Sequence, residues 1–321
     1  MKRKISLLLA MLLCLMAVTG CTADNHTSSE QNSQSQIQQT EYQYQLTQEI
    51  QSIDLTVPSR AIEIPATLTL PAKGENALVP LVVMHHDFMG DRSTNGAFDL
   101  LAQKLAEQGI ASIRMDFSGR GDSTETFRNN SLVYADADAK ASQAYAIANA
   151  PIDASRVGYF GYGFGAVLSL DSGTRKDSGV KALALLAPYA DEAEATMRHM
   201  FGSEFERMHK EAFSEQRYTT YTGPDGAVYE ISVNWFDDLV QARPTQNLED
   251  FSGDMLIVYS DNDPYLPAGV CTELAEQAKK TAQVTVKQVT GAGHDFGFSG
   301  EDSVMKEEVL QDISEFFAAS L

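Results

Sequence analysis

Residues 158–166 read Gly-Tyr-Phe-Gly-Tyr-Gly-Phe-Gly-Ala, and this stretch decides the fold. The apolar residues that lead into it predict a strand, the closely spaced glycines predict a sharp turn, and the residues from Phe164 onward predict a helix. Gly161 and Gly165 flank the turn, and Gly163 stands at its tip. We therefore expect a strand, a tight turn and a helix in direct succession, a unit typical of folds in which strands and helices alternate.

The rest of the chain continues this alternation. A hairpin is expected over 50–57 and 61–70, and the almost wholly apolar run 79–85 predicts a strand buried on both faces. Further strands are expected at 110–115, 156–160, 180–186, 255–260 and 284–289, and helices at 97–108, 133–148, 164–171, 270–278 and 304–319. This order predicts an α/β fold with a mostly parallel central sheet and helices on both faces.

One stretch, about 188–251, interrupts the alternation. It begins with Met, Phe, Glu and His at helical spacing and continues into Gly223-Pro-Asp-Gly226, a turn between aromatic runs that predicts a hairpin. We interpret the stretch as a cap inserted over the ends of the sheet strands, within a domain that spans 49–321.

The N-terminal segment has the features of a bacterial lipoprotein signal. Residues 1–20 comprise a basic start, an apolar run too short to span a membrane, and small residues. Val18-Thr19-Gly20-Cys21 resembles the lipobox, which implies lipid on Cys21 and an extracytoplasmic protein anchored to the bacterial membrane. A plain signal peptide with an incidental Cys21 is the alternative. Residues 21–48, rich in Ser, Gln, Thr and Asn, predict a disordered tether.

Composition excludes some partners. The 321 residues carry a formal charge of −20, which repels phosphate backbones and anionic headgroups, so we expect no nucleic-acid binding and membrane attachment through lipid alone. Of three cysteines, Cys14 leaves with the signal and Cys21 would carry lipid. Cys271 is then expected to pack without a disulfide partner.

The turn at 161–165 has the context of the G-x-S-x-G nucleophile elbow. With four other segments in matching order, the chain resembles the α/β-hydrolase family over roughly 50–320, among its esterase-like and serine-aminopeptidase-like members with a cap after the sixth strand. The resemblance implies a small-molecule ester or acyl substrate and a nucleophile at the position of Gly163. Glycine has no side chain. Either the reactive atom is lost, or the elbow lies elsewhere.

The other segments supply the remaining site residues by resemblance. Asp263 stands in the acid turn, with Asp261 as the neighbouring alternative, and His294 stands in the G-x-x-H turn that presents the catalytic histidine. The segment 86–90, His-Asp-Phe-Met-Gly, resembles the family's H-G-F-x-G turn, so the oxyanion donors would be the N–H groups of Phe88 and Phe164.

Asp87 departs from that pattern, because the family prefers glycine there. A carboxylate beside an oxyanion site would disfavour developing negative charge. Alternatively Asp87 points to solvent and His86 packs in the core, or His85, His86 and Asp87 form a metal site, although adjacent strand residues face opposite ways. We expect neither a metal nor a cofactor. The segment 116–123 matches D-x-x-G-x-G-x-S, a loop whose role in the family is structural.

The elbow tip is expected to have a positive φ, which glycine adopts without steric cost. Catalysis would then be impaired or rerouted, for instance through a water activated by His294 and Asp263. Tyr162 should point away from the pocket, and a nucleophile from the cap, Ser203 or Ser214, stays open. We interpret the site as a catalytic triad that has lost its nucleophile. Another side-chain oxygen within bonding reach of the His294 imidazole would contradict this interpretation.

The alternative function is that of a binding protein, a pseudo-hydrolase that holds an apolar small ligand or a partner. Trp235, Phe236 and several tyrosines of the cap could close over such a ligand, or could simply pack the cap onto the body. A sequence error or an introduced change at Gly163 is a third explanation.

Overall fold

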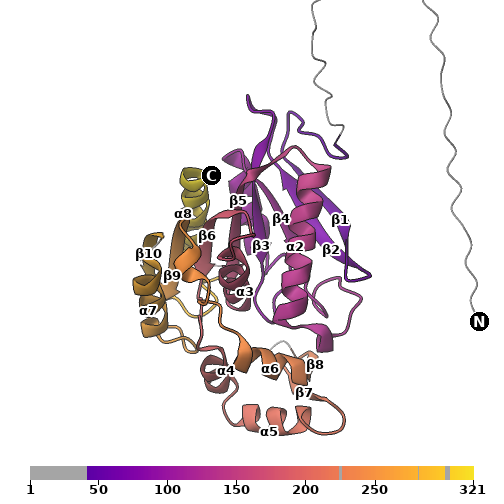
Figure 1. The fold of residues 1–321 in the computed structure, drawn as a ribbon, viewed down its shortest axis with the longest axis vertical. Coiled ribbons are helices and arrows are strands. Elements are labelled where there is room, and N and C mark those ends of the chain that lie inside the picture. The colour runs from indigo at the N-terminus through magenta and orange to yellow at the C-terminus, as the bar shows by residue number, and fades with distance from the viewer. Residues whose placement is uncertain (1–41, 224–225, 281, 301–303) are drawn as a thin grey trace, which may run out of the picture. The chain divides into compact units, whose positions relative to one another are not determined.

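The computed structural model describes residues 42–223, 226–280, 282–300 and 304–321. The expected signal, the lipidation site Cys21 and most of the expected tether lie outside these ranges. Eight strands form one sheet in the order β1-β2-β4-β3-β5-β6-β9-β10 (Figure 1). They are β1 (Gln51–Ser59), β2 (Ile62–Leu70), β3 (Val79–His85), β4 (Ala111–Met115), β5 (Ile152–Tyr162), β6 (Val180–Leu186), β9 (Asp254–Ser260) and β10 (Gln283–Val289).

The sheet is mostly parallel, as predicted. Only β1 with β2 and β2 with β4 pair antiparallel, and the remaining neighbours run parallel. Strand β3 is buried along its whole length, which explains its continuous apolar sequence. The register pairs His85 of β3 with Gly161 of β5. The loop after β3 and the turn after β5 therefore start side by side, at the carboxyl ends of two central strands.

Five helices cover the sheet: α1 (Ala97–Glu107), α2 (Leu132–Asn149), α3 (Phe164–Gly173), α7 (Ala268–Ala278) and α8 (Val304–Ser320). Helix α1 packs against α8, where Lys104 forms an ion pair with Glu307, and α2 packs against α3. A short 3₁₀ turn, η1 (Phe127–Asn129), precedes α2, whose first turn is capped by the Ser131 hydroxyl.

The cap lies between β6 and β9. It comprises α4 (Ala193–Phe201), α5 (Ser203–Ala212), the antiparallel hairpin β7 (Tyr218–Thr222) and β8 (Val228–Ser232), α6 (Val233–Gln241) and η2 (Leu248–Asp250). Figure 1 shows it gathered at one end of the sheet. Trp235 is 2% exposed and packs against Phe236 and against Phe88 of the body, at ring-centre distances of 4.8 and 5.0 Å. These aromatic residues hold the cap onto the body.

The ordered body begins earlier than the sequence indicated. Residues 42–48 were expected in the tether, yet the Tyr44 N–H donates to the carbonyl of Asn149 at the end of α2, and the Lys73 N–H donates to Thr47. No helix within the described ranges is both long and apolar enough to cross a membrane.

Candidate active site

The turn after β5 has the geometry of a strained elbow. Gly163 has φ 54° and ψ −113°. Residues other than glycine adopt this backbone conformation only with steric strain. Gly161 and Gly165 must be glycines because neighbouring backbone atoms lie too close to them for a side chain. A β-carbon on Gly161 would overlap the carbonyl of Gly165, and a β-carbon on Gly165 would overlap the carbonyl of His85. The glycine-rich sequence thus lets β3, the turn and α3 meet at van der Waals distance.

The side chain that fills the space above this turn is Asp87. Its Oδ1 accepts a hydrogen bond of 2.8 Å from the N–H of Phe164, the first residue of α3. A β-carbon added to Gly163 would overlap the same Oδ1. Asp87 therefore occupies both the place of an elbow side chain and the place where an oxyanion would accept from Phe164. The alternative in which Asp87 points to solvent is wrong, because these contacts hold it over the turn.

His294 lies between two carboxylates. Its Nδ1 is 2.7 Å from Oδ2 of Asp263, and its Nε2 is 3.7 Å from Oδ2 of Asp87. Asp263 is fixed in turn, since its Oδ1 accepts from the N–H groups of Tyr265 and Leu266. Asp261, the alternative acid, instead accepts from the N–H of Gly291. The structure thus brings Asp263, His294 and Asp87 into one row beside Gly163.

The charges in this row reinforce one another. Burial alone would lower the pKa of His294, but the carboxylates of Asp263 and Asp87 raise it to about 10. Burial would raise the pKa of Asp87, but the His294 imidazolium and the N–H groups of Phe164 and Phe88 outweigh it, so this pKa is lowered. The pKa of Asp263 is lowered for the same reason, against its burial, by His294. At neutral pH the site holds an imidazolium between two carboxylates.

This protonation state decides what the histidine can do. A general base needs a free lone pair, and an imidazolium has none. In this state His294 can donate a proton, and it would have to lose one before it could activate water. The expectation of a water activated by His294 and Asp263 therefore stays a prediction that would require this deprotonation first.

Tyr162 is a site residue that the sequence reasoning missed. It was expected to point away from the pocket, and its buried hydroxyl donates to the backbone carbonyl of His294 at 3.0 Å, with its ring 5.5 Å from the imidazole. Tyr265 flanks the imidazole at a ring-centre distance of 5.4 Å. The two tyrosines hold the loop that carries His294 against the end of β5.

His85 and His86 serve the core and do not form a metal site with Asp87. His86 uses both ring nitrogens: Nε2 accepts from the Phe117 N–H, and Nδ1 donates to the Asp87 carbonyl. Nδ1 of His85 donates to Ser169 on α3. Burial lowers the pKa of His85 to about 3. Within the described ranges, no three His, Cys, Asp or Glu side chains are grouped so that they could hold a metal ion.

The loop at 116–123 is built around one buried carboxylate. Asp116 accepts from the N–H groups of Arg92 and Asp122 and forms an ion pair with the Arg92 guanidinium. Gly121 is required because a β-carbon there would overlap the Asp116 carboxyl group. These contacts are structural and tie the loop after β4 to the loop after β3.

The two cap serines considered as nucleophiles, Ser203 and Ser214, form no hydrogen bond with His294 among the described residues, and Ser203 is exposed at the start of α5. Ser214 donates to the carbonyl of Glu211 in the cap. Within the described part of the chain, the side-chain nitrogens of His294 have only Asp263 and Asp87 as hydrogen-bond or ion-pair partners. The partner of Nε2 is thus a carboxylate oxygen, and no serine hydroxyl of the described residues forms a hydrogen bond with the ring.

The surroundings of the row are apolar but not sealed. The Asp87 and His294 side chains retain 21% and 17% of their exposure. Phe88 is buried against Phe127, Trp235 and Phe164, with ring-centre distances of 5.1, 5.0 and 6.2 Å. Phe88 and its aromatic neighbours thus pack the body and the cap together next to Asp87.

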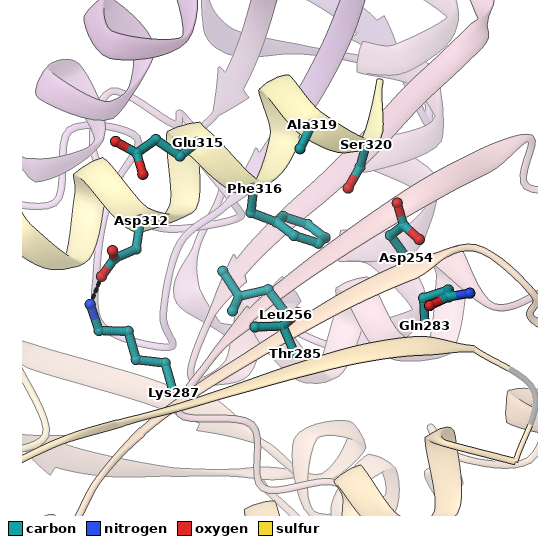
Figure 2. A pocket seen from close by; sticks show the side chains of 10 residues that line it. All are labelled: Asp254, Leu256, Gln283, Thr285, Lys287, Asp312, Glu315, Phe316, Ala319 and Ser320. Carbon is teal, nitrogen blue, oxygen red and sulfur yellow. Dashed lines mark ion pairs between the residues drawn. The ribbon is translucent and has the colours of Figure 1, made fainter.

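A cavity lies at another place on the sheet, away from Asp87, His294 and Asp263. A cavity of about 450 Å³ separates the β9–β10 edge of the sheet from α8, and Lys287 of β10 reaches across it to form an ion pair with Asp312 (Figure 2). Leu256 and Phe316 form its apolar floor. None of Asp87, Asp263 and His294 lines this cavity.

The free thiol of Cys271 is fully buried in α7, and burial raises its pKa to about 12. The thiol therefore packs in the core and is not placed to react.

Comparison with solved structures supports the fold. Est1E of Butyrivibrio proteoclasticus, in a structure with bound ferulic acid, is 20% identical, with a TM-score of 0.67 over 83% of this chain and 98% of that one. An esterase of Pyrococcus furiosus is 15% identical, with a TM-score of 0.61 over 84% and 92%. DcsB, in complex with a substrate analogue, is 16% identical, with a TM-score of 0.63 over 84% and 100%. No curated protein matches the sequence.

The family model described as serine aminopeptidase, S33 (Hydrolase_4) matches residues 81–299. This range begins in β3 and ends after the His294 loop, so it contains the Asp87, Gly163 and Asp263 turns as well as the cap. With its eight-stranded, mostly parallel sheet and its flanking helices, the chain is an α/β-hydrolase and belongs to the serine aminopeptidase S33 family.

Proposed function

We propose that this protein is an extracytoplasmic lipoprotein whose hydrolase domain has lost serine-dependent cleavage of esters and acyl bonds and carries a charged Asp87–His294–Asp263 site in its place. One observation carries the proposal: the Asp87 carboxylate fills the space above Gly163 and accepts the Phe164 N–H. Acyl transfer needs a nucleophile at the elbow and an empty oxyanion site. Neither is available while Asp87 holds this position.

The raised pKa of His294 supports the same conclusion. A serine mechanism begins when the histidine takes a proton, and here the two neighbouring carboxylates keep the imidazole protonated. The substrate class is proposed by analogy. The structurally similar Est1E and DcsB are described with ferulic acid and with a substrate analogue, so a small molecule is the expected ligand of this site as well.

A purely ligand-binding role has less support. It depended on cap aromatic residues that could close over an apolar molecule, and Trp235 and Phe236 are each 2% exposed and packed between cap and body. The lipid anchor is proposed from the sequence around Cys21 alone.

The test uses p-nitrophenyl acetate and butyrate with the full chain purified in detergent. The natural protein should not exceed the turnover of its His294→Gln variant. The double variant Asp87→Gly/Gly163→Ser, which empties the oxyanion site and supplies a hydroxyl, should gain turnover with an initial acyl-enzyme burst. Asp87→Gly/Gly163→Ala is the matched control, because it has the same backbone and no hydroxyl. Turnover by the natural protein that depends on His294 would refute the proposal.

A further inference from the structure

A polar cavity lies on one face of β1, β2 and β4, away from the turn at Gly163. Its volume of about 470 Å³ falls within the range typical of small-molecule sites. The register places Asp54 of β1 opposite Thr67 of β2, and Thr67 opposite Arg114 of β4. Cross-strand partners point to the same face of a sheet, so these three side chains form a polar strip across three strands.

Side chains of two neighbouring loops and of α1 hold the walls of this cavity. Arg92, on the loop after β3, forms ion pairs with Asp116 and Asp122, on the loop after β4. Asp99, in the first turn of α1, forms an ion pair with Arg114. These contacts join the strands, the loops and the helix, so the cavity is formed before any ligand arrives.

The guanidinium group of Arg114 is only partly satisfied by the protein. The side chain is 6% exposed, and its Nη2 is bonded to Asp99. Nε and Nη1 are buried without a hydrogen-bond partner among the described residues. Burial lowers the pKa of Arg114, and the neighbouring Asp99 carboxylate does not fully offset this effect. Buried donors without a partner are costly, so the expected partner of these N–H groups is an oxygen atom from outside the chain.

The same cavity also offers carboxylate oxygens that can accept hydrogen bonds. Oδ1 of Asp54 accepts from the Thr67 hydroxyl at 2.7 Å, and its Oδ2 has no hydrogen-bond partner among the described residues. Oδ1 of Asp91 accepts from the N–H groups of Ser93 and Thr94, and its Oδ2 likewise has no partner in the described part of the chain. The cavity therefore presents unpaired donors and unpaired acceptors together.

We propose that this cavity binds a neutral sugar, whose hydroxyl groups accept hydrogen bonds from Arg114 and donate hydrogen bonds to Asp54 and Asp91. A hydroxyl group both donates and accepts, so neighbouring hydroxyls of one sugar ring match walls that offer both kinds of partner. The proposal goes beyond the chemistry of the elbow, because none of Asp87, Asp263 and His294 lines this cavity.

Other classes of ligand fit these walls less well. Five aspartates outnumber two arginines among the lining residues, so an anion such as phosphate would be repelled. A metal ion would face the guanidinium groups of Arg92 and Arg114, and no three acidic, His or Cys side chains in the described ranges are grouped to hold one. An apolar molecule would meet no apolar side chain, since all the lining residues are polar apart from Gly121.

The experiment titrates the full chain with glucose, galactose, mannose and N-acetylglucosamine, in a detergent without a sugar headgroup. Binding is followed by calorimetry and by the NMR resonances of the arginine Nε–H groups. At least one sugar should bind with a Kd of about 1 mM or tighter and shift the Arg114 resonance. Arg114→Met and Asp54→Ala should each weaken this binding by about 10-fold or more, because each removes a charged hydrogen-bond partner. Asp177→Asn, which alters an exposed carboxylate after α3, is the control and should bind as the natural protein does.

Asp54 is exposed, so Asp54→Ala keeps the proposal testable even if Arg114→Met does not fold. If none of the four sugars binds and the Arg114 resonance stays in place, ordered water alone satisfies the guanidinium and the sugar site is overturned. A resonance that moves with inorganic phosphate and not with sugar, or sugar binding that neither variant weakens, would overturn it as well. These outcomes are separate from ester turnover, which tests the proposed function.

Discussion

The Asp87 carboxylate occupies the space that a β-carbon on Gly163 would need. The two residues are 76 positions apart in the chain and meet because β3 and β5 end side by side. In the family's usual pattern these positions carry glycine and serine. Here the larger side chain stands on the loop after β3 and the glycine stands on the turn after β5. The side chain that fills the space above the turn thus comes from the loop after β3 and not from the turn itself.

The first prediction follows from this overlap. Gly163→Ser alone should destabilise the fold by about 1–3 kcal/mol, because it strains a positive φ and displaces Asp87 from the Phe164 N–H. Adding Asp87→Gly removes the overlap, so the double variant should recover part of the loss. Urea unfolding of the natural protein, the two single variants and the double variant gives the interaction free energy between positions 87 and 163. Additive effects of the two changes would mean that the side chains do not compete for one space.

The second prediction concerns the flanking glycines. Gly161→Ala and Gly165→Ala should each destabilise by about 1–3 kcal/mol or more, because the new β-carbon meets backbone carbonyls that cannot move aside easily. Gly269→Ala is the matched control. It lies in helix α7 with open space around it, and alanine should be neutral or stabilise by up to about 1 kcal/mol. Equal effects at the three positions, measured by urea unfolding, would contradict the close approach of β3, the turn and α3.

The third prediction concerns pH. The pKa of His294 is raised to about 10 in the folded protein, against an ordinary value of 6.5. Its contribution to stability is therefore complete below about pH 6.5 and declines as the pH rises toward 10. The free energy of unfolding should fall over this range by up to about 1.4 kcal/mol per pH unit more in the natural protein than in His294→Gln. Parallel curves for the two proteins would show that folding does not raise the pKa of His294.

The fourth prediction concerns the membrane anchor. Cys21→Ser should move the protein from the membrane fraction to the soluble fraction of a bacterial host and abolish labelling with a radioactive fatty acid, because the acyl chains are the expected means of attachment. Cys271→Ser is the control, since this buried residue should leave the distribution unchanged. Membrane retention of Cys21→Ser without label would point to a plain signal or a protein partner.

The architecture was predictable because its signals are local. The apolar run of β3, the glycines after β5 and the alternation of strands and helices each follow from short stretches of sequence. The order of the Asp263 and His294 turns could be read in the same way, and the structure brings these two side chains together.

The position of Asp87 could not be predicted in this way. It is fixed by the N–H of Phe164, 77 residues further along the chain, and by the absence of a side chain on Gly163. Tyr162 shows the same limit. Its hydroxyl bonds to the carbonyl of His294, 132 residues away, a contact that no local sequence pattern indicates. Residues 42–48 were assigned to the tether by composition, whereas single contacts such as that of Tyr44 attach them to the body.

The most direct measurement of the central claim is an NMR titration of the His294 ring nitrogens in the natural protein and in Asp87→Asn. If Asp87 holds the place of the elbow side chain and pairs with the imidazole, His294 should stay doubly protonated past pH 9 and titrate near 10, and the loss of the Asp87 charge should lower this pKa. A His294 that titrates near 6.5 in both proteins would contradict the pairing and, with it, the account of the site.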